Sequence, residues 1–259
     1  MQAPILDNKD PAAPSVFEAA ALLREARRQK GLPPTDVPAV CILDPDGDIV
    51  RHLRRSGQAR LAEGWPCYHT ELHEFGLAGK TAGIIGCAVG APFAVLVTEE
   101  LFACGCRLLI SLTSAGQITP VGNPPYFVVI DRALRDEGTS YHYAAPAAFA
   151  EADPALVETA IKALGDTGLR AYVGPSWTTD APFRETSDAI AAARARGILA
   201  VEMEAAALYS FARTANRRVL CLAHVTNTMA VAEQDFEKGE ADGTVDALRV
   251  LEAIAGALA

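Results

Sequence analysis

Two acidic residues stand in one of the most apolar stretches of the chain, AVEMEAAALYSF at residues 200–211. On an extended strand, Glu202 and Glu204 would share one face and Met203 would take the other. A carboxylate accepts two hydrogen bonds at once, which suits the vicinal diol of a sugar, and methionine offers a soft apolar surface beneath such a ring. The structural alternative is a solvated strand end or a helix N-terminus, where acids suit the helix dipole.

The segments around this pair alternate between strand-like and helix-like patterns. Continuous apolar strands between helices predict an α/β sheet that is covered on both faces. Residues 1–36 are expected to form a helical extension and linker, and residues 37–259 a single domain. We expect strands at 37–44, 80–90, 107–116, 126–131, 169–177, 198–204 and 217–227, and helices at 15–31, 93–105, 154–164, 187–196, 204–214 and 243–258.

Four of the expected strands end in small or polar residues that chemistry can use. Their ends read GCAVGAP, SLTSAGQ, AVEMEA and HVTNT. In sheets of this kind, ligands gather at the carboxyl ends of the strands. The convergence of the four segments therefore predicts one site at this edge of the sheet.

Composition argues against several classes of partner and site. The net charge of −9 argues against a nucleic-acid or anionic-membrane partner. No run approaches the ~18 apolar residues of a membrane span, and the N-terminus lacks a secretory pattern, so we expect a cytoplasmic protein. Six cysteines without a CxxC pair indicate buried free thiols. His69 and His73 stand at helical i, i+4 spacing without an evident third ligand, so no metal site is predicted.

The segment GILAVEMEAAALYSFA resembles the signature of the nucleoside phosphorylase and nucleosidase superfamily, and LFACGCRLLISLTSAGQI, RALRDEGTSYHYAAP and HVTN follow the same pattern. The resemblance implies a mixed, partly barrel-like sheet flanked by helices. It also implies a homo-oligomer (dimer, trimer or hexamer) that needs no cofactor and cleaves the N-ribosidic bond of a small-molecule nucleoside. In that case Glu204 holds the ribose diol, Met203 lies beneath the sugar and Glu202 lies beside it.

The same resemblance implies where the base is bound. Asn227 stands where relatives that cleave purine nucleosides usually carry aspartate, and an amide donates a hydrogen bond but is no general acid at ordinary pH. Uridine phosphorylases have asparagine there, which favours a pyrimidine base such as uracil. An aromatic side chain of the base-binding stretch GPSWTTDAPFRET is equally suited to the core. The side chains expected at the base are Phe183 or Trp177 for stacking, Arg184 and Glu185 for its polar edge, and Gln117.

The nucleophile is the part of the pattern that the chain matches least. Phosphorylases of this group carry a Gly-Asp-Pro-x-Arg loop and two further arginines, whereas this chain has LDPDGD at residues 43–48 and no arginine at any of these positions. A phosphate co-substrate would then rest on Ser114 and on backbone N–H groups around Gly47 and Gly90. The arginines within residues 51–55 are the nearest substitute cations.

Nucleosidases use water in place of phosphate. They read GSAGG where this chain has TSAGQ, and they place a general base near Asp48, so Asp46 or Asp48 is a candidate for activating water. Asp, Pro and Gly suit a simple turn equally well. We predict a nucleoside phosphorylase with Asn227, Glu204 and Asp48 as catalytic residues. Hydrolysis is the alternative, and a catalytically inactive nucleoside-binding protein is a third.

Overall fold

The fold is built on one large sheet, described by a computed structural model over residues 4–229, 236 and 238–259. The strands are β1 (Val40–Asp44), β2 (Ala59–Leu61), β3 (His73–Leu77), β4 (Lys80–Gly86), β5 (Leu108–Gln117), β6 (Tyr126–Asp136), β7 (Phe149–Glu151), β8 (Ala171–Thr179), β9 (Ala200–Glu202) and β10 (Arg218–Asn227). The helices are η1 (Pro4–Leu6), α1 (Ala19–Lys30), α2 (Asp48–Arg55), α3 (Ala91–Ala103), α4 (Ser140–Tyr143), α5 (Pro154–Gly165), η2 (Pro182–Arg184), α6 (Ser187–Ala195), α7 (Ala205–Thr214) and α8 (Thr244–Leu258).

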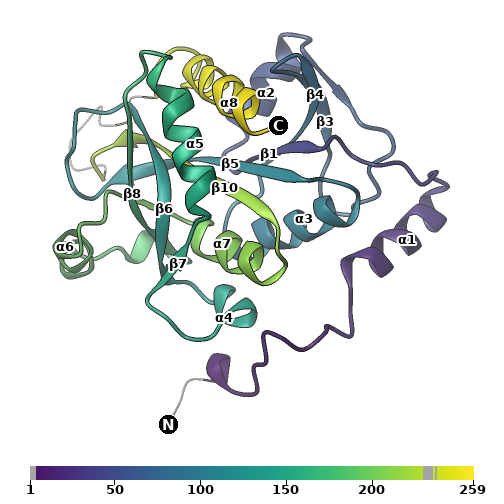
Figure 1. Ribbon diagram of the computed structural model, residues 1–259, viewed down its shortest axis with the longest axis horizontal. Helices are drawn as coiled ribbons and strands as arrows, with labels where there is room; N and C mark the ends of the chain where they lie inside the picture. The colour runs from purple at the N-terminus through teal and green to yellow at the C-terminus, as the bar shows by residue number, and fades with distance from the viewer. Residues whose placement is uncertain (1–3, 230–235, 237) are drawn as a thin grey trace.

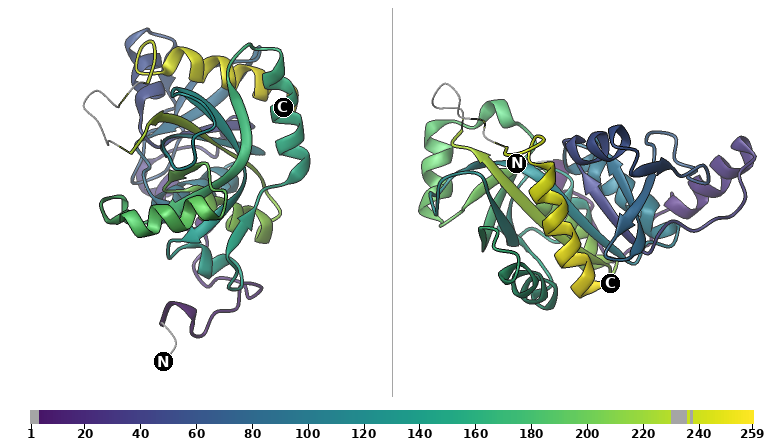
Figure 2. Two further views of the ribbon diagram at one scale, coloured as in Figure 1. Left: turned by 90° about the vertical axis from the view of Figure 1, so that its left-hand side faces the viewer. Right: turned by 90° about the horizontal axis from the view of Figure 1, so that it is seen from above.

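Half of this sheet closes into a barrel. β10 pairs antiparallel with β6 and parallel with β5, and the path from β5 through β9 and β8 to β6 completes a ring. Beyond β5 the sheet continues through β1, β4, β3 and β2 as an open wing (Figure 1, Figure 2). The chain therefore has the mixed, partly barrel-like α/β sheet that the sequence predicts.

The central strands are buried on both faces. Every residue of β1 is buried, and Cys41, Ile42 and Leu43 expose no surface. In Figure 1, α5 and α8 cover one side of β5 and β10, and α3 and α7 cover the other. Because burial of an aliphatic side chain stabilises by about 1.5–3 kcal/mol, two covered faces favour continuous apolar strands over alternating ones.

The segment LDPDGD forms a turn that leads directly into α2. Gly47 has a φ of 76°, in the left-handed region that glycine adopts without steric cost, and α2 begins at Asp48. The Asp44 carboxylate accepts hydrogen bonds from the N–H groups of Gly47 (3.2 Å) and Val50 (2.9 Å). Burial raises the pKa of Asp44 to about 7. This buried cap fixes the loop in which Asp46 lies.

Several elements differ from the prediction. The expected strand at 198–204 ends at Glu202, and Glu204 is the N-cap of α7, so the two carboxylates are not on one strand face. His73 opens β3 after an irregular segment, so His69 and His73, four residues apart in the sequence, do not lie on one helix. The short strands β2, β3 and β7 were not predicted because their sequences are brief and mixed in polarity.

The cysteines are all free, and five of the six are buried; Cys87 is exposed. Across the described ranges, no helix combines the length and the apolarity needed to cross a membrane.

Candidate active site

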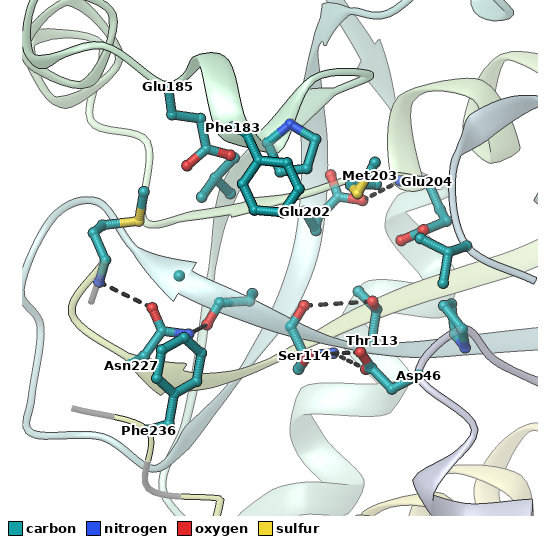
Figure 3. Close-up of a pocket in the computed structure, with 17 residues that line it drawn as sticks. Asp46, Thr113, Ser114, Phe183, Glu185, Glu202, Met203, Glu204, Asn227 and Phe236 are labelled. Carbon is teal, nitrogen blue, oxygen red and sulfur yellow. Dashed lines mark hydrogen bonds between the residues drawn. The ribbon is translucent and has the colours of Figure 1, made fainter. Parts of the chain in front are cut away.

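A cavity of about 360 Å³ opens at the carboxyl ends of the strands, where the sequence predicts convergence. One end, here termed the Glu204 end, contains Asp46, Ser114, Glu202, Met203 and Glu204 (Figure 3). The opposite end, here termed the Asn227 end, is lined by Phe183, Glu185, Asn227, Met229 and Phe236. The residues come from β5, β9, β10, η2 and the segments after β1, β4, β9, η2 and β10.

Glu202 has a fully satisfied carboxylate. Its Oε1 accepts hydrogen bonds from the hydroxyls of Ser176 (2.9 Å) and Thr178 (2.5 Å) on β8. Its Oε2 accepts from the backbone N–H groups of Glu204 and Ala205, both at 2.7 Å. The side chain is buried, and burial raises its pKa. Glu202 therefore ties β8 and β9 to the start of α7 and has little capacity left for a ligand.

Glu204 has one oxygen that remains available. Its Oε1 accepts the N–H of Gly90 at 2.7 Å, at the start of α3. Its Oε2 is buried and has no hydrogen-bond partner among the described residues. Burial, together with the nearby charge of Glu202, raises the pKa of Glu204 to about 8. An unpaired buried oxygen costs free energy, and a ligand hydroxyl at this position would remove that cost.

Asp46 is bound to Ser114 by two hydrogen bonds. The backbone N–H of Ser114 donates to Oδ2 at 2.6 Å, and the Ser114 hydroxyl donates to Oδ1 at 2.8 Å. Because Asp46 lies in the loop after β1 and Ser114 on β5, these bonds join two strand ends at the floor of the cavity (Figure 3). Both donors of Ser114, a residue expected to bind phosphate, are thus occupied by a carboxylate.

Asp48, predicted as catalytic, does not line this cavity. It accepts hydrogen bonds from Arg51 and from Lys238, each at 2.6 Å, and so joins α2 to the segment before α8. Arg51 also donates to the backbone carbonyl of Asp46, and Arg54 lies 3.8 Å from Glu71. The arginines proposed as substitute cations are therefore engaged elsewhere or do not line the cavity.

The lining is strongly acidic. Asp46, Glu185, Glu202 and Glu204 all line the cavity, and its described lining contains no Lys, Arg or His. The geometry provides carboxylates for hydroxyl groups and for developing positive charge, but no fixed positive charge for an anion.

The Asn227 end is more open. The Asn227 Oδ1 accepts the N–H of Met229 at 2.9 Å. Among the described residues, its Nδ2 makes only long contacts, 3.5 Å to the Ala115 carbonyl and 3.4 Å to the Thr226 hydroxyl. The amide is thereby oriented with its donor group free to bind more strongly to a ligand. Phe183 and Phe236 are 98% and 62% exposed, so both rings are open to stack on a planar group.

Residues 39–256 match the sequence profile described as the phosphorylase superfamily. The chain belongs to this superfamily. The match covers the whole sheet, the helices from α2 to α7 and all but the last two residues of α8, and leaves outside it the segment that carries η1 and α1.

Curated relatives in the superfamily are named after different nucleoside substrates. A guanosine phosphorylase of Halorubrum lacusprofundi is 26% identical over 60% of this chain and 65% of its own length. A DeoD-type purine nucleoside phosphorylase of Roseobacter denitrificans is 29% identical over 60% of this chain and 67% of its own length. A uridine phosphorylase of Thermococcus kodakarensis is 26% identical over 69% of this chain and 73% of its own length. The chain thus matches about two thirds of the length of the first two relatives.

Solved structures agree on the fold. Uridine phosphorylase of Vibrio fischeri matches with a TM-score of 0.70 at 23% identity, covering 88% of this chain and 93% of that one. A 5′-methylthioadenosine/S-adenosylhomocysteine nucleosidase of Neisseria meningitidis matches with a TM-score of 0.68 at 20% identity, covering 85% and 99%. The same fold therefore occurs in a phosphorylase and in a nucleosidase.

The cavity brings together only part of the predicted superfamily site. Trp177 lies outside it: its ring is 4% exposed, and its Nε1 donates to Asp136 at 2.9 Å. Gln117 also lies outside, donating to the Gly122 carbonyl and the Tyr126 hydroxyl. Arg184 is exposed next to the cavity. Those that line the cavity are Ser114, Phe183, Glu202, Met203, Glu204 and Asn227; Gly47 and Gly90 do not.

The remaining lining consists of apolar residues that the sequence did not point to and of two acids that it named as alternatives. Val89, Met229 and Phe236 are apolar residues of loops, and no pattern in the sequence distinguishes them. Asp46 had been weighed against Asp48, and the contact with Ser114 distinguishes the two. Glu185, expected with Arg184 at the polar edge of the base, lines the cavity, and only its half-buried position could not be read from the sequence.

Proposed function

We propose that this protein hydrolyses the N-ribosidic bond of a nucleoside, with water as the nucleophile and Asp46 as the general base. The observation that carries the proposal is the occupation of both Ser114 donors by Asp46. A phosphate at this place would meet carboxylates and no described cation. Two like charges 4 Å apart repel by about 4 kcal/mol at an effective dielectric constant of 20, whereas water is neutral.

The proposed reaction uses the Glu204 end for the sugar. The free Oε2 of Glu204 accepts the ribose hydroxyls, and Met203 supports the ring. Hydrogen bonds from the ribose hydroxyls favour the ionised form of Glu204. As the bond to the base breaks, positive charge grows on the ribose, and the carboxylates of Glu204 and Asp46 stabilise it. Asp46 then accepts a proton from the water that attacks the sugar carbon.

The proposed base lies at the Asn227 end, between Phe183 and Phe236. The Asn227 Nδ2 donates a hydrogen bond to a carbonyl oxygen of the base, which gains negative charge as it leaves. Uracil, the base favoured by Asn227 in the sequence, has such a carbonyl, and so do the 6-oxopurines. Uridine and guanosine each appear in the name of a relative.

Phosphorolysis is the second candidate, because the three curated relatives described above are named phosphorylases. It would require a cation from outside the described lining, and a second subunit of a homo-oligomer is the source that we propose for it. We also propose that the protein acts in the cytoplasm and that residues 1–36 form an extension of one domain.

The test is product analysis of the purified protein on a panel of purine and pyrimidine nucleosides, with and without phosphate. Free ribose and free base in both buffers support hydrolysis. Ribose 1-phosphate that forms only with phosphate supports phosphorolysis. If nucleosides bind without turnover in either buffer, the protein is a nucleoside-binding member of the superfamily and the proposal is wrong.

A further inference from the structure

Departure of a base leaves an electron pair on it, and the Asn227 end must neutralise that pair. Asn227 can donate a hydrogen bond but cannot deliver a proton at ordinary pH. Asp46, Glu202 and Glu204 lie at the opposite end of the cavity (Figure 3). Among the described lining residues of the Asn227 end, Glu185 is the one with a titratable side chain.

Glu185 is placed to face a bound base. It follows η2 directly, and its carboxylate points into the cavity from the wall opposite Asn227, beside the ring of Phe183 (Figure 3). The side chain is half-buried, and no described residue forms a hydrogen bond or ion pair with it. A carboxyl group held without a partner in a cavity wall is available to a ligand.

We propose that Glu185 is the general acid that protonates the departing base. The assignment rests on the proposed cleavage of an N-ribosidic bond. As the bond between the sugar carbon and the base nitrogen breaks, its electron pair moves to the base, and the Glu185 carboxyl proton transfers to a ring nitrogen or carbonyl oxygen of that base. Water adds to the sugar carbon and gives its proton to Asp46. Exchange with solvent then returns a proton to Glu185 and removes one from Asp46.

The environment keeps the carboxyl group protonated up to neutral pH. Burial raises the pKa of Glu185 to about 7. The other charged groups of its own segment are exposed, namely Arg184 before it and Asp188 in α6. Glu233, Asp235 and Glu237 of the segment before α8 lie outside the described residues. An acid works best when its pKa lies near the operating pH, so cleavage that depends on Glu185 weakens as the pH rises through about 7.

The experiment compares Glu185→Gln with wild type on paired substrates that differ in their need for a proton. Inosine is paired with 7-methylinosine, whose cationic base leaves without protonation, and uridine is paired with 5-fluorouridine, whose base is a better leaving group. Asp188→Asn is the matched control, because it also replaces a carboxylate by an amide but at an exposed position in α6 outside the cavity lining. Thermal unfolding of each variant verifies that it is folded.

The expected result is a loss of about 10²–10³-fold in kcat/KM on the unactivated nucleoside with much smaller loss on its activated partner. The variant should also lose the decline of activity above about pH 7. An equal loss on both partners would assign Glu185 to binding and overturn the proposal, as would no loss on either. A wild type that cleaves neither pair refutes the proposed function itself, and the role of Glu185 with it.

Discussion

The two ends of the cavity are built in different ways. At the Glu204 end, the carboxylates of Asp46, Glu202 and Glu204 are each fixed by at least one backbone N–H, and they lie where buried strands end. At the Asn227 end, Phe183 and Phe236 are largely exposed and come from η2 and the segment before α8. We infer that, in the proposed reaction, rigid elements hold the sugar and loops on that scaffold select the base.

The most damaging change at the Glu204 end should be Asp46→Asn. The amide keeps the size of the side chain but cannot accept a proton, so we expect kcat to fall by about 10³-fold with a small change in KM. Steady-state kinetics on the best nucleoside measures both. Asp48→Asn is the matched control, since Asp48 pairs with Arg51 and Lys238 outside the cavity. Equal losses in the two variants would contradict the role of Asp46.

Glu204→Gln sharpens the comparison because, without loss of size, it removes the charge that Glu204 carries once hydrogen bonds from the ribose diol favour its ionised form. We expect about a 10²-fold loss in kcat/KM, because hydrogen bonds to a charged group contribute about 1.5–3 kcal/mol. The measurement is repeated with a 2′-deoxynucleoside, which lacks one hydroxyl of the diol. The difference between wild type and variant should shrink on that substrate. A difference of the same size on both would mean that Glu204 does not bind the diol.

Glu202 and Glu204 should differ most in stability. Glu202→Ala leaves buried donors of Ser176, Thr178 and the start of α7 without an acceptor, so the free energy of unfolding should fall by about 3 kcal/mol. Glu204→Ala should cost less, because half of that carboxylate is already unpaired. Urea unfolding measures the free energy of unfolding of both variants, and a larger decrease for Glu204→Ala than for Glu202→Ala would contradict the account.

The stability difference between wild type and Glu204→Gln should change with pH in a definite direction. The pKa of Glu204 is about 8 in the folded protein against 4.5 ordinarily, so the folded state binds more protons between these values. The stability that this group contributes is present below about pH 4.5 and is lost as the pH rises through about 8. Relative to wild type, Glu204→Gln should therefore become more stable as the pH rises, and urea unfolding across this range measures the trend.

The smallest effect is expected from Trp177→Phe. The change removes the hydrogen bond from Nε1 to Asp136 but keeps an aromatic ring in the core, so stability should fall by about 1 kcal/mol. Activity should be unchanged, because the ring does not line the cavity. A selective rise in KM for nucleosides would restore Trp177 to the base site.

The sequence predicted the Glu204 end better than the Asn227 end for a physical reason. Glu202, Glu204 and Ser114 lie at or next to the ends of buried strands, which the sheet holds in a fixed place. Side chains alternate along a strand, and Ser176 and Thr178 both contact Glu202, so Trp177 between them faces the other side. The sequence alone does not say which face of β8 points to the site, and the hydrogen bonds of Ser176 and Thr178 to Glu202 assign it.

The contacts of the loops were beyond prediction. Asp46 and Asp48 are two residues apart in the same turn, and only the position of Ser114 on β5 distinguishes them. Met229, Phe236 and Glu185 lie in segments without periodic structure, where side-chain direction depends on tertiary contacts. The fold, by contrast, followed from the order of apolar strands and helices, with short edge strands as the main omission.

The most direct test of the central claim is the rate of base release by the wild-type protein as phosphate is raised from zero to saturation. If Asp46 activates water at the place where a phosphate would bind, the rate is the same at every phosphate concentration and ribose is the sugar product. A rate that starts at zero and rises with phosphate, with ribose 1-phosphate as the product, would contradict the account.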